Sequence, residues 1–268
     1  MGKIRLDILL HQQGAASSRE KARAMILAGE VMVNGVMQDK PGTNVDESAT
    51  IEIKPARLPY VSRGGLKLEK AIKVFSVDFT DKTVWDIGAS TGGYTDCALK
   101  HGARKVFALD VGYGQLDWTL RNDPRVVNIE RTNIRYFDPR ELGELVDIVT
   151  IDVAFISTAK VFPVIQAGMK DNGQVISLIK PQFEAGRDKI GKKGVVKDKK
   201  VHKQVLRDCI INANQTGLFC KNLTWSPIKG PQGNIEYFVL LNREQENLAG
   251  LEFKIEETVE TAHQSLGG

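Results

Sequence analysis

The spacing of apolar residues predicts a small module at the start of the chain. Apolar residues recur at helical intervals in two stretches, and they then form two short runs around an Asn-Gly pair and one alternating stretch. In chain order these parts are 6–14, 18–29, the runs flanking Asn34-Gly35, and 50–53. Helical periodicity predicts amphipathic helices, and an Asn-Gly pair between apolar runs is typical of a hairpin. The first 57 residues therefore predict a helix–helix–hairpin–strand module of the α+β class.

A larger body follows, in which buried strands alternate with helices. Five apolar runs predict strands at 83–88, 105–110, 126–129, 147–152 and 173–180. Stretches with helical spacing, such as 157–169, separate these strands, so a mostly parallel sheet with helices on both faces is expected. After a helix near 200–215, two closely spaced strands at 222–228 and 236–241 predict an antiparallel final pair.

These changes of pattern predict four segments. They are a head at 1–57, a basic linker with a first helix at 58–80, an α/β body at 81–245, and a tail with a predicted helix at 246–268. Between residues 54 and 73 the chain carries six basic residues and one acid. Such a linker can contact phosphates as well as set the spacing of the domains.

Composition bears on whether the protein is membrane-spanning, secreted or metal-binding. The chain has 268 residues, 42% of them hydrophobic, and a net charge of +4. Neither a transmembrane stretch nor the apolar core of a signal peptide is found in it. The three cysteines form no Cys-x-x-Cys pair and the four histidines are scattered. We therefore expect a reducing, cytoplasmic setting and no metal site.

A loop rich in small residues follows the first strand of the body. It has the form Asp86-x-Gly88-x-x-x-Gly92-Gly93, with Ser90 where a dinucleotide fingerprint would place its second glycine. An acid before the loop suits a cationic sulfonium ligand better than a pyrophosphate. Asp110, at the end of the second strand, is placed to bind ribose hydroxyls. Together they predict S-adenosylmethionine as the cofactor; the alternative is a turn of purely structural role.

Four charged residues far apart in sequence are expected at one edge of the sheet. Asp152 and Lys180 end parallel strands, Glu236 begins the final antiparallel strand, and Lys67 lies on the helix before the sheet. Ligands of open parallel sheets bind at the carboxyl edge, where these strand ends meet. Each residue alone is more often a cap or a surface ion pair, but their joint position beside the predicted cofactor loop favours a catalytic set.

The head resembles the RNA-binding module named after ribosomal protein S-four. The resemblance rests on Arg5-Leu6-Asp7, Ser18-Arg19-Glu20-Lys21-Ala22 and Gly29-Glu30-Val31-x-Val33-Asn34-Gly35. It implies that the basic residues of this module, Arg5, Arg19, Lys21 and Arg23, face RNA phosphates. The alternative is a solvated helix face, because Glu20 and Glu30 lie nearby.

The whole chain is similar to the TlyA family, called hemolysins but acting as rRNA 2′-O-methyltransferases with an FtsJ-like domain. The blocks that carry this similarity are Ser62-Arg63-Gly64-Gly65-x-Lys67, Asp86 to Gly93, Thr150-Ile151-Asp152-Val153-Ala154-Phe155-Ile156-Ser157, Ile179-Lys180-Pro181-Gln182-Phe183-Glu184 and Gly233-Asn234-x-Glu236. The best-described relatives have an Arg-x-Trp-Val segment before the catalytic lysine. This chain departs from that pattern, with Arg57-Leu58-Pro59-Tyr60-Val61 and no tryptophan.

The resemblance implies a Rossmann-like methyltransferase fold, rRNA or ribosomal subunits as the partner, and two sets of site residues. The catalytic set is Lys67, Asp152, Lys180 and Glu236. The residues that would hold S-adenosylmethionine are Asp86, Gly88, Ala89, Ser90, Gly92, Gly93, Asp110 and Asn133.

Residue chemistry suggests roles for this set. A ribose 2′-hydroxyl is a weak acid, and a neutral lysine could accept its proton as the methyl group transfers. Lys180 is the candidate base and Lys67 the second cation, while Asp152 and Glu236 orient the two amines. In-line placement of the reacting atoms should supply most of the rate.

A basic segment follows the candidate base. Residues 180–203 contain nine basic side chains and three acids, which predicts an RNA-holding loop, although a solvated disordered loop has the same composition. The expected RNA contacts of the body are Arg63, Lys189, Lys192 and Lys193.

Two alternative functions were weighed against the sequence. A non-catalytic ribosome-binding factor predicts a damaged cofactor loop or catalytic set. A membrane-lytic hemolysin predicts a long apolar or amphipathic membrane helix. The sequence has neither feature.

Overall fold

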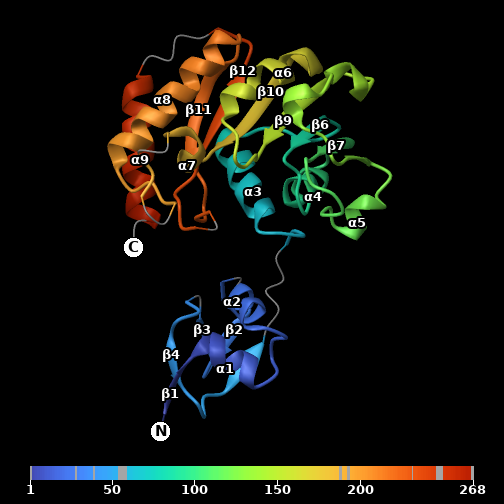
Figure 1. Ribbon diagram of the computed structural model, residues 1–268. Coiled ribbons are helices and arrows are strands. Elements are labelled where there is room, and N and C mark those ends of the chain that lie inside the picture. The colour runs from blue at the N-terminus through green and yellow to red at the C-terminus, as the bar shows by residue number, and fades with distance from the viewer. Residues whose placement is uncertain are drawn as a thin grey trace. The chain divides into compact units, whose positions relative to one another are not determined.

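The structure is a computed structural model that describes residues 2–27, 29–38, 40–53, 59–186, 189–191, 194–230, 232–245 and 250–266. The chain divides into two compact units, Met1–Leu58 and Pro59–Gly268. Each unit is described by itself (Figure 1).

The first unit is a small α+β module. Its elements are β1 (Lys3–Arg5), α1 (Leu6–Gln12), α2 (Arg19–Leu27), β2 (Val31–Val33), β3 (Val36–Gln38), β4 (Asn44–Asp46) and β5 (Ile51–Ile53). β1 pairs with β4, and β2 lies between β3 and β5. The predicted hairpin is confirmed: Asn34 and Gly35 both have positive φ, as the tight turn between β2 and β3 requires. The pattern missed β1 and β4, because each of these strands contains a single apolar residue.

The second unit is built on a seven-stranded sheet with the order β11-β12-β10-β9-β6-β7-β8. Its strands are β6 (Thr83–Ile87), β7 (Lys105–Leu109), β8 (Val126–Ile129), β9 (Val146–Ile151), β10 (Met169–Ile179), β11 (Phe219–Trp225) and β12 (Tyr237–Asn242). The five strands from β10 to β8 run parallel, and β12 is antiparallel to both of its neighbours, β10 and β11. The predicted mostly parallel sheet with an antiparallel final pair is therefore confirmed.

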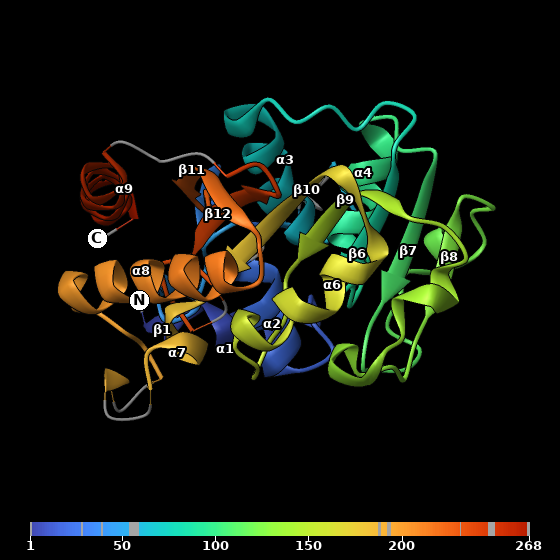
Figure 2. The same cartoon turned by 90° about the horizontal axis from the view of Figure 1, so that it is seen from above.

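Helices cover both faces of this sheet (Figure 2). One face carries α3 (Gly64–Phe75), α4 (Gly93–Lys100) and α5 (Trp118–Arg121), and the other carries α6 (Phe162–Gly168), α8 (Lys199–Gln215) and α9 (Leu251–Leu266). Short helical turns complete the unit: η1 (Ile134–Tyr136), η2 (Pro139–Leu142), η3 (Thr158–Lys160) and α7 (Pro181–Glu184). None of the helices in the described residues is long and apolar enough to cross a membrane.

Side chains along each strand alternate between the two faces. Val84 packs in the core beneath α3 and α4, whereas its neighbour Trp85 packs in the core beneath α6 and α8. The same alternation assigns a face to every residue at a strand end, and this determines which charged groups can meet.

Three predicted boundaries are corrected by the structure. The helix expected at 157–169 is divided into η3 and α6, and β10 begins at Met169 rather than near residue 173. Glu236 lies one residue before β12 instead of beginning it. The first part of the predicted linker, 54–58, lies outside the described residues.

Candidate active site

Strand register brings the predicted charged residues to one edge and one face of the sheet. Ile179 of β10 pairs with Tyr237 of β12, so Lys180 and Glu236 lie at adjacent strand ends. Asp152 follows β9, and its backbone N–H donates to the carbonyl of Ile87 in β6. By the alternation described above, all of these strand-end side chains belong to the face covered by α3 and α4.

The four charged residues form two ion pairs. Lys67 Nζ, on α3, donates to Glu236 Oε2 at 2.6 Å, and Lys180 Nζ lies 2.5 Å from Asp152 Oδ1. Glu236 is fully buried, and the other three side chains are between 10% and 18% exposed. The sequence predicted that both acids orient the amines; the structure adds that each amine has its own carboxylate.

The site retains unused hydrogen-bonding capacity. Glu236 Oε1, Asp152 Oδ1 and the Tyr94 hydroxyl are buried and have no hydrogen-bond partner. The Lys180 ammonium is at ion-pair distance from Asp152 but outside hydrogen-bonding geometry to that oxygen. Because unpartnered buried polar atoms are costly, these groups are available to a polar ligand or a water.

The glycine loop passes directly beneath Asp152. Gly88 has φ +89°, and a Cβ added there would lie 2.5 Å from the Asp152 carbonyl oxygen. Only glycine combines this left-handed backbone with so close an approach. Gly92, also left-handed at φ +94°, caps α4, and Ala89 between them is buried. The loop therefore packs against the strand end that carries Asp152, beside the two ion pairs.

Asp110 is hydrogen-bonded to the backbone of the glycine loop. Its carboxylate accepts hydrogen bonds from Ser90 N at 2.8 Å and Gly112 N at 2.7 Å. Asn133, which follows β8, caps η1 through a bond from Arg135 N. Asp110 therefore lies at the carboxyl edge next to the loop, as the sequence predicted, and Asn133 follows the neighbouring strand.

Asp86 is buried below the loop rather than exposed in it. Its two oxygens accept hydrogen bonds from Thr95 Oγ1 at 2.7 Å and from Thr150 Oγ1 at 3.0 Å. Burial raises the pKa of Asp86 to about 7, although both threonine bonds act to lower it. The enclosure of this acid by two hydroxyls was not predictable from the sequence.

The helix that carries Lys67 packs tightly on the glycine loop. A Cβ added at Gly93 would lie 2.2 Å from Ser62 Oγ and 2.9 Å from the backbone N of Gly65. Tyr60, in the segment that lacks the tryptophan of the relatives, is buried and donates to Glu69. The segment therefore contains a buried aromatic residue, Tyr60, whose hydroxyl group is hydrogen-bonded.

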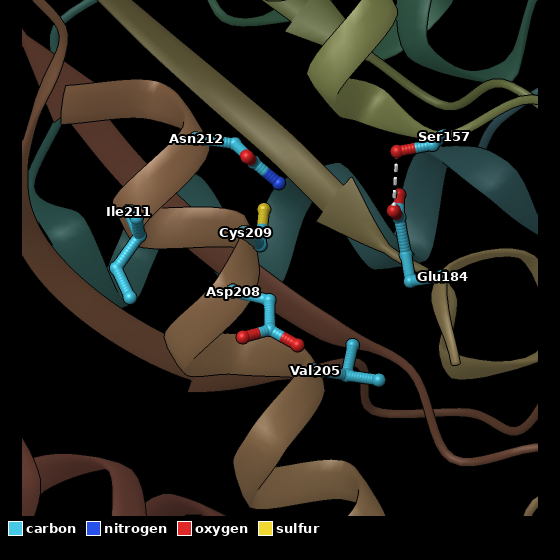
Figure 3. A pocket seen from close by; sticks show the side chains of 7 residues that line it. All are labelled: Ser157, Glu184, Val205, Asp208, Cys209, Ile211 and Asn212. Carbon is cyan, nitrogen blue, oxygen red and sulfur yellow. Dashed lines mark hydrogen bonds between the residues drawn. The ribbon is translucent and has the colours of Figure 1, made fainter. Parts of the chain in front are cut away.

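Sequence reasoning missed an aromatic pair beside Asp152. Phe155 is 90% exposed with φ +62°, and its ring lies 5.0 Å from that of Phe183. Nearby, the Glu184 carboxylate accepts a bond from Ser157 Oγ at 2.6 Å, which ties the loop after β9 to α7. Ser157 and Glu184 line a pocket of about 320 Å³ against α8 (Figure 3). The positive φ of Phe155 and the hydrogen bond from Ser157 to Glu184 keep the Phe155 side chain on the surface. Phe155 lies in the sequence block from Thr150 to Ser157, but its exposure is visible only in the structure.

A second group that sequence reasoning missed lies next to Asp110. Arg131 stacks at 3.8 Å over the ring of Tyr113, and Arg135 lies 5.2 Å from the ring of Tyr136. Both tyrosines are more than 60% exposed. These pairs form an exposed surface that is both cationic and aromatic.

The basic residues of the head divide into two kinds. Arg5 and Arg19 both donate to the buried carboxylate of Asp7, and the hydrogen bond from Arg5 is the main reason that the pKa of Asp7 is lowered to about 2. Lys21 and Arg23 are exposed on α2. Arg5 and Arg19 thus have a structural task that the sequence did not reveal.

The basic segment is less positive than its composition suggests. Lys199 and Lys203 form ion pairs with Glu260 of α9, and Lys203 also pairs with Glu256. The exposed basic residues of the described part of the segment are Lys189, Lys197 and Lys200, and in the linker Arg63 is exposed before α3. Lys192 and Lys193 lie outside the described residues. Helix α9 therefore neutralises part of the charge that the sequence assigned to RNA.

Comparison with known proteins agrees with this division into two units. Residues 60–243 match the family described as FtsJ-like methyltransferase, and residues 4–51 match the S4 domain. The chain is 48% identical over 268 residues to the Bacillus subtilis protein YqxC, covering 98% of this chain and 95% of the relative. It is 40% identical over 240 residues to the 16S/23S rRNA (cytidine-2′-O)-methyltransferase TlyA of Mycobacterium tuberculosis, covering 89% and 90%. A solved structure from Streptococcus thermophilus covers 100% of this chain and 98% of its own, with 42% identity and a TM-score of 0.79.

Proposed function

We propose, from the premise that this chain belongs to the FtsJ-like methyltransferase family, that it transfers a methyl group from S-adenosylmethionine to a ribose 2′-hydroxyl of ribosomal RNA. The observation that carries the proposal is the two lysine–carboxylate ion pairs beside the glycine loop. The S4 domain and the activity named for the Mycobacterium tuberculosis relative support ribosomal RNA as the substrate. Such a substrate implies a cytoplasmic protein.

The loop has the features that S-adenosylmethionine requires. Gly88 lets the loop pack directly against the backbone of Asp152, and each Asp110 oxygen that accepts a backbone N–H keeps a lone pair for a ribose hydroxyl. Asp86 supplies a buried acid that would favour a cationic ligand. When bound, the cofactor supplies an electrophilic methyl group. The remaining residues that would surround it are Ala89, Ser90, Gly92, Gly93 and Asn133.

The two ion pairs would divide the catalytic work. Lys180, in its neutral form, would accept the proton of the ribose hydroxyl, and Asp152 would orient its amine. Glu236 holds Lys67 so that a second cation faces the oxygen as negative charge develops on it. Glu236 Oε1, which has no hydrogen-bond partner, would accept a hydrogen bond from the bound nucleotide or from a water.

RNA would be held by exposed cations and by aromatic faces. Lys21 and Arg23 would contact phosphates through the head. In the body, Arg131 and Arg135 on their tyrosines would add contacts, and Phe155 offers a face on which the target base can stack. Further proposed contacts are Arg5, Arg19, Arg63, Lys189, Lys192 and Lys193.

The test replaces the candidate base in two ways. Lys180→Ala removes both charge and base, whereas Lys180→Arg keeps the charge but cannot become neutral near pH 7. Both variants should bind S-adenosylmethionine and lose methyl transfer to ribosomal subunits in single-turnover assays with saturating RNA. A Lys180→Arg variant that turns over at the wild-type rate would show that Lys180 acts only as a cation. A wild-type protein that methylates no ribosomal RNA would refute the proposal as a whole.

A further inference from the structure

Both backbone polar groups of one buried residue, Val196, are held by side chains that flank Glu236. Asn234 Oδ1 accepts from Val196 N at 3.0 Å, and His202 Nε2 lies 2.9 Å from the Val196 carbonyl oxygen. The other end of the Asn234 amide donates to the Gly194 carbonyl at 2.9 Å. Residues 194–196 of the basic segment are therefore held in place by two buried side chains.

These holding groups are directly connected to the strand that presents Glu236. Asn234 lies two residues before Glu236, and Tyr237 lies one residue after it with its hydroxyl 2.6 Å from His202 Nδ1. Asn234, His202, Glu236 and Tyr237 are all at most 1% exposed. We call the connected set of Asn234, Val196, His202 and Tyr237 the latch.

The acceptors of the latch determine the tautomer of His202. A carbonyl oxygen only accepts, so His202 Nε2 carries the proton and Nδ1 is an acceptor facing the Tyr237 hydroxyl. His263 of α9 lies 3.2 Å from the same Nδ1 and adds a second group on that side. Burial lowers the pKa of His202 to about 4, so the ring is neutral at physiological pH. A fully satisfied buried network favours a single geometry.

The latch connects the basic segment, which begins at Lys180, to the residues around Glu236. The basic segment begins at Lys180, carries the exposed Lys189 and Lys197, and is held at 194–196 against the residues around Glu236. Between α7 and α8 (Lys199–Gln215), the described residues of the segment are tied to the strand that presents Glu236 through this set of hydrogen bonds. The latch places Lys197, the residue directly after Val196, at a fixed position relative to Glu236.

We propose that Asn234 and His202 are positioning residues that fix the basic segment relative to the two ion pairs, so that an RNA strand bound by Lys197 is in register with the catalytic set. This inference rests on the proposed function. It assigns to Asn234 a task in RNA placement that is separate from proton transfer and from cofactor binding.

A double-mutant cycle tests the proposal with full-length protein and ribosomal subunits. Lys197→Ala should raise KM for the RNA about fivefold in the wild-type background, the effect of one lost phosphate contact. In an Asn234→Ala background the same change should alter KM less than twofold, because the lysine is no longer positioned. Affinity for S-adenosylmethionine should stay within twofold throughout. If the effect of Lys197→Ala is the same in both backgrounds, the latch has no positioning role.

A matched control separates positioning from stability. Thr83→Val removes a buried hydroxyl that bonds Glu144 at the opposite edge of the sheet, and it should leave the effect of Lys197→Ala at its wild-type size. If Asn234→Ala does not fold, Tyr237→Phe removes a single hydroxyl at constant volume, and it should reduce the effect of Lys197→Ala in the same way. An undiminished effect in that variant would overturn the proposal.

A spectroscopic measurement tests the latch without RNA. Nitrogen NMR of the wild type at pH 7 should show His202 protonated at Nε2 and unprotonated at Nδ1, and the Val196 amide should exchange slowly. Asn234→Ala should speed that exchange at least tenfold. The opposite tautomer, or unchanged exchange, would refute the latch. An inactive wild type with these signatures intact would instead refute the proposed function.

Discussion

Replacing Asp86 by asparagine should stabilise the body of the protein, and should do so more at pH 8 than at pH 5. The folded state holds the Asp86 pKa at about 7, against 3.8 for an ordinary aspartate. Protonation is therefore favoured in the folded state, and the ionised form is penalised as pH rises from about 4 to 7. Linkage gives a penalty of about 2 kcal/mol at pH 5 and about 4 kcal/mol at pH 8, with no further change above that pH. An asparagine, which does not ionise, avoids this penalty and can still accept a bond from Thr95 or Thr150.

Tryptophan fluorescence during denaturant unfolding measures this effect in the intact chain. All three tryptophans, Trp85, Trp118 and Trp225, belong to the second unit, so the signal reports the unit that contains Asp86. The stability difference between Asp86→Asn and the wild type should increase with pH between 5 and 7. A gain that does not depend on pH, or a loss of stability at pH 8, would refute the reasoning. The variant should also lose cofactor affinity, which would explain why a destabilising acid is retained.

The remaining predictions concern the glycine loop, the head and the aromatic pair. Gly88→Ala should lower stability by more than about 2 kcal/mol and abolish cofactor binding, measured by thermal melting and calorimetry, because an added methyl group meets backbone at a left-handed position. Arg19→Glu should destabilise the head by about 2 kcal/mol, since it places a second carboxylate beside the buried Asp7. Lys21→Glu should leave stability unchanged in the same melts while weakening RNA binding, most strongly at low salt; equal destabilisation by the two variants would contradict the assignment. Phe155→Leu should raise KM for RNA about tenfold at constant cofactor affinity, and an unchanged KM would exclude base stacking.

The sequence was sufficient to predict the sheet and to select the four charged residues, because both depend on local pattern. Strands show as apolar runs, and an acid or lysine directly after a run must lie at the edge of the sheet. The pairing of Lys67 with Glu236 was not predictable, because it depends on the register of β12 against β10 and on how α3 packs.

Burial explains most of what the sequence could not predict. Asp7 and Asp86 are both single acids within apolar stretches, and one is enclosed by two arginines and the other by two threonines. Phe155 is an apolar residue that the hydrophobic pattern would place inside, and it is 90% exposed. Neighbours distant in sequence decide each of these cases, so no local pattern records them.

The one-sided arrangement of the site leaves the amino edge of the sheet free for engineering. Gly143, in the turn between η2 and β9, is exposed, has φ +74°, and has no atom within 4 Å of an added Cβ. The glycine loop and both ion pairs lie at the carboxyl edge. A short peptide tag or dye-acceptor sequence inserted after Gly143 should therefore leave methyl transfer intact. Such a chain could report, by its fluorescence, when the protein binds and releases the proposed RNA substrate.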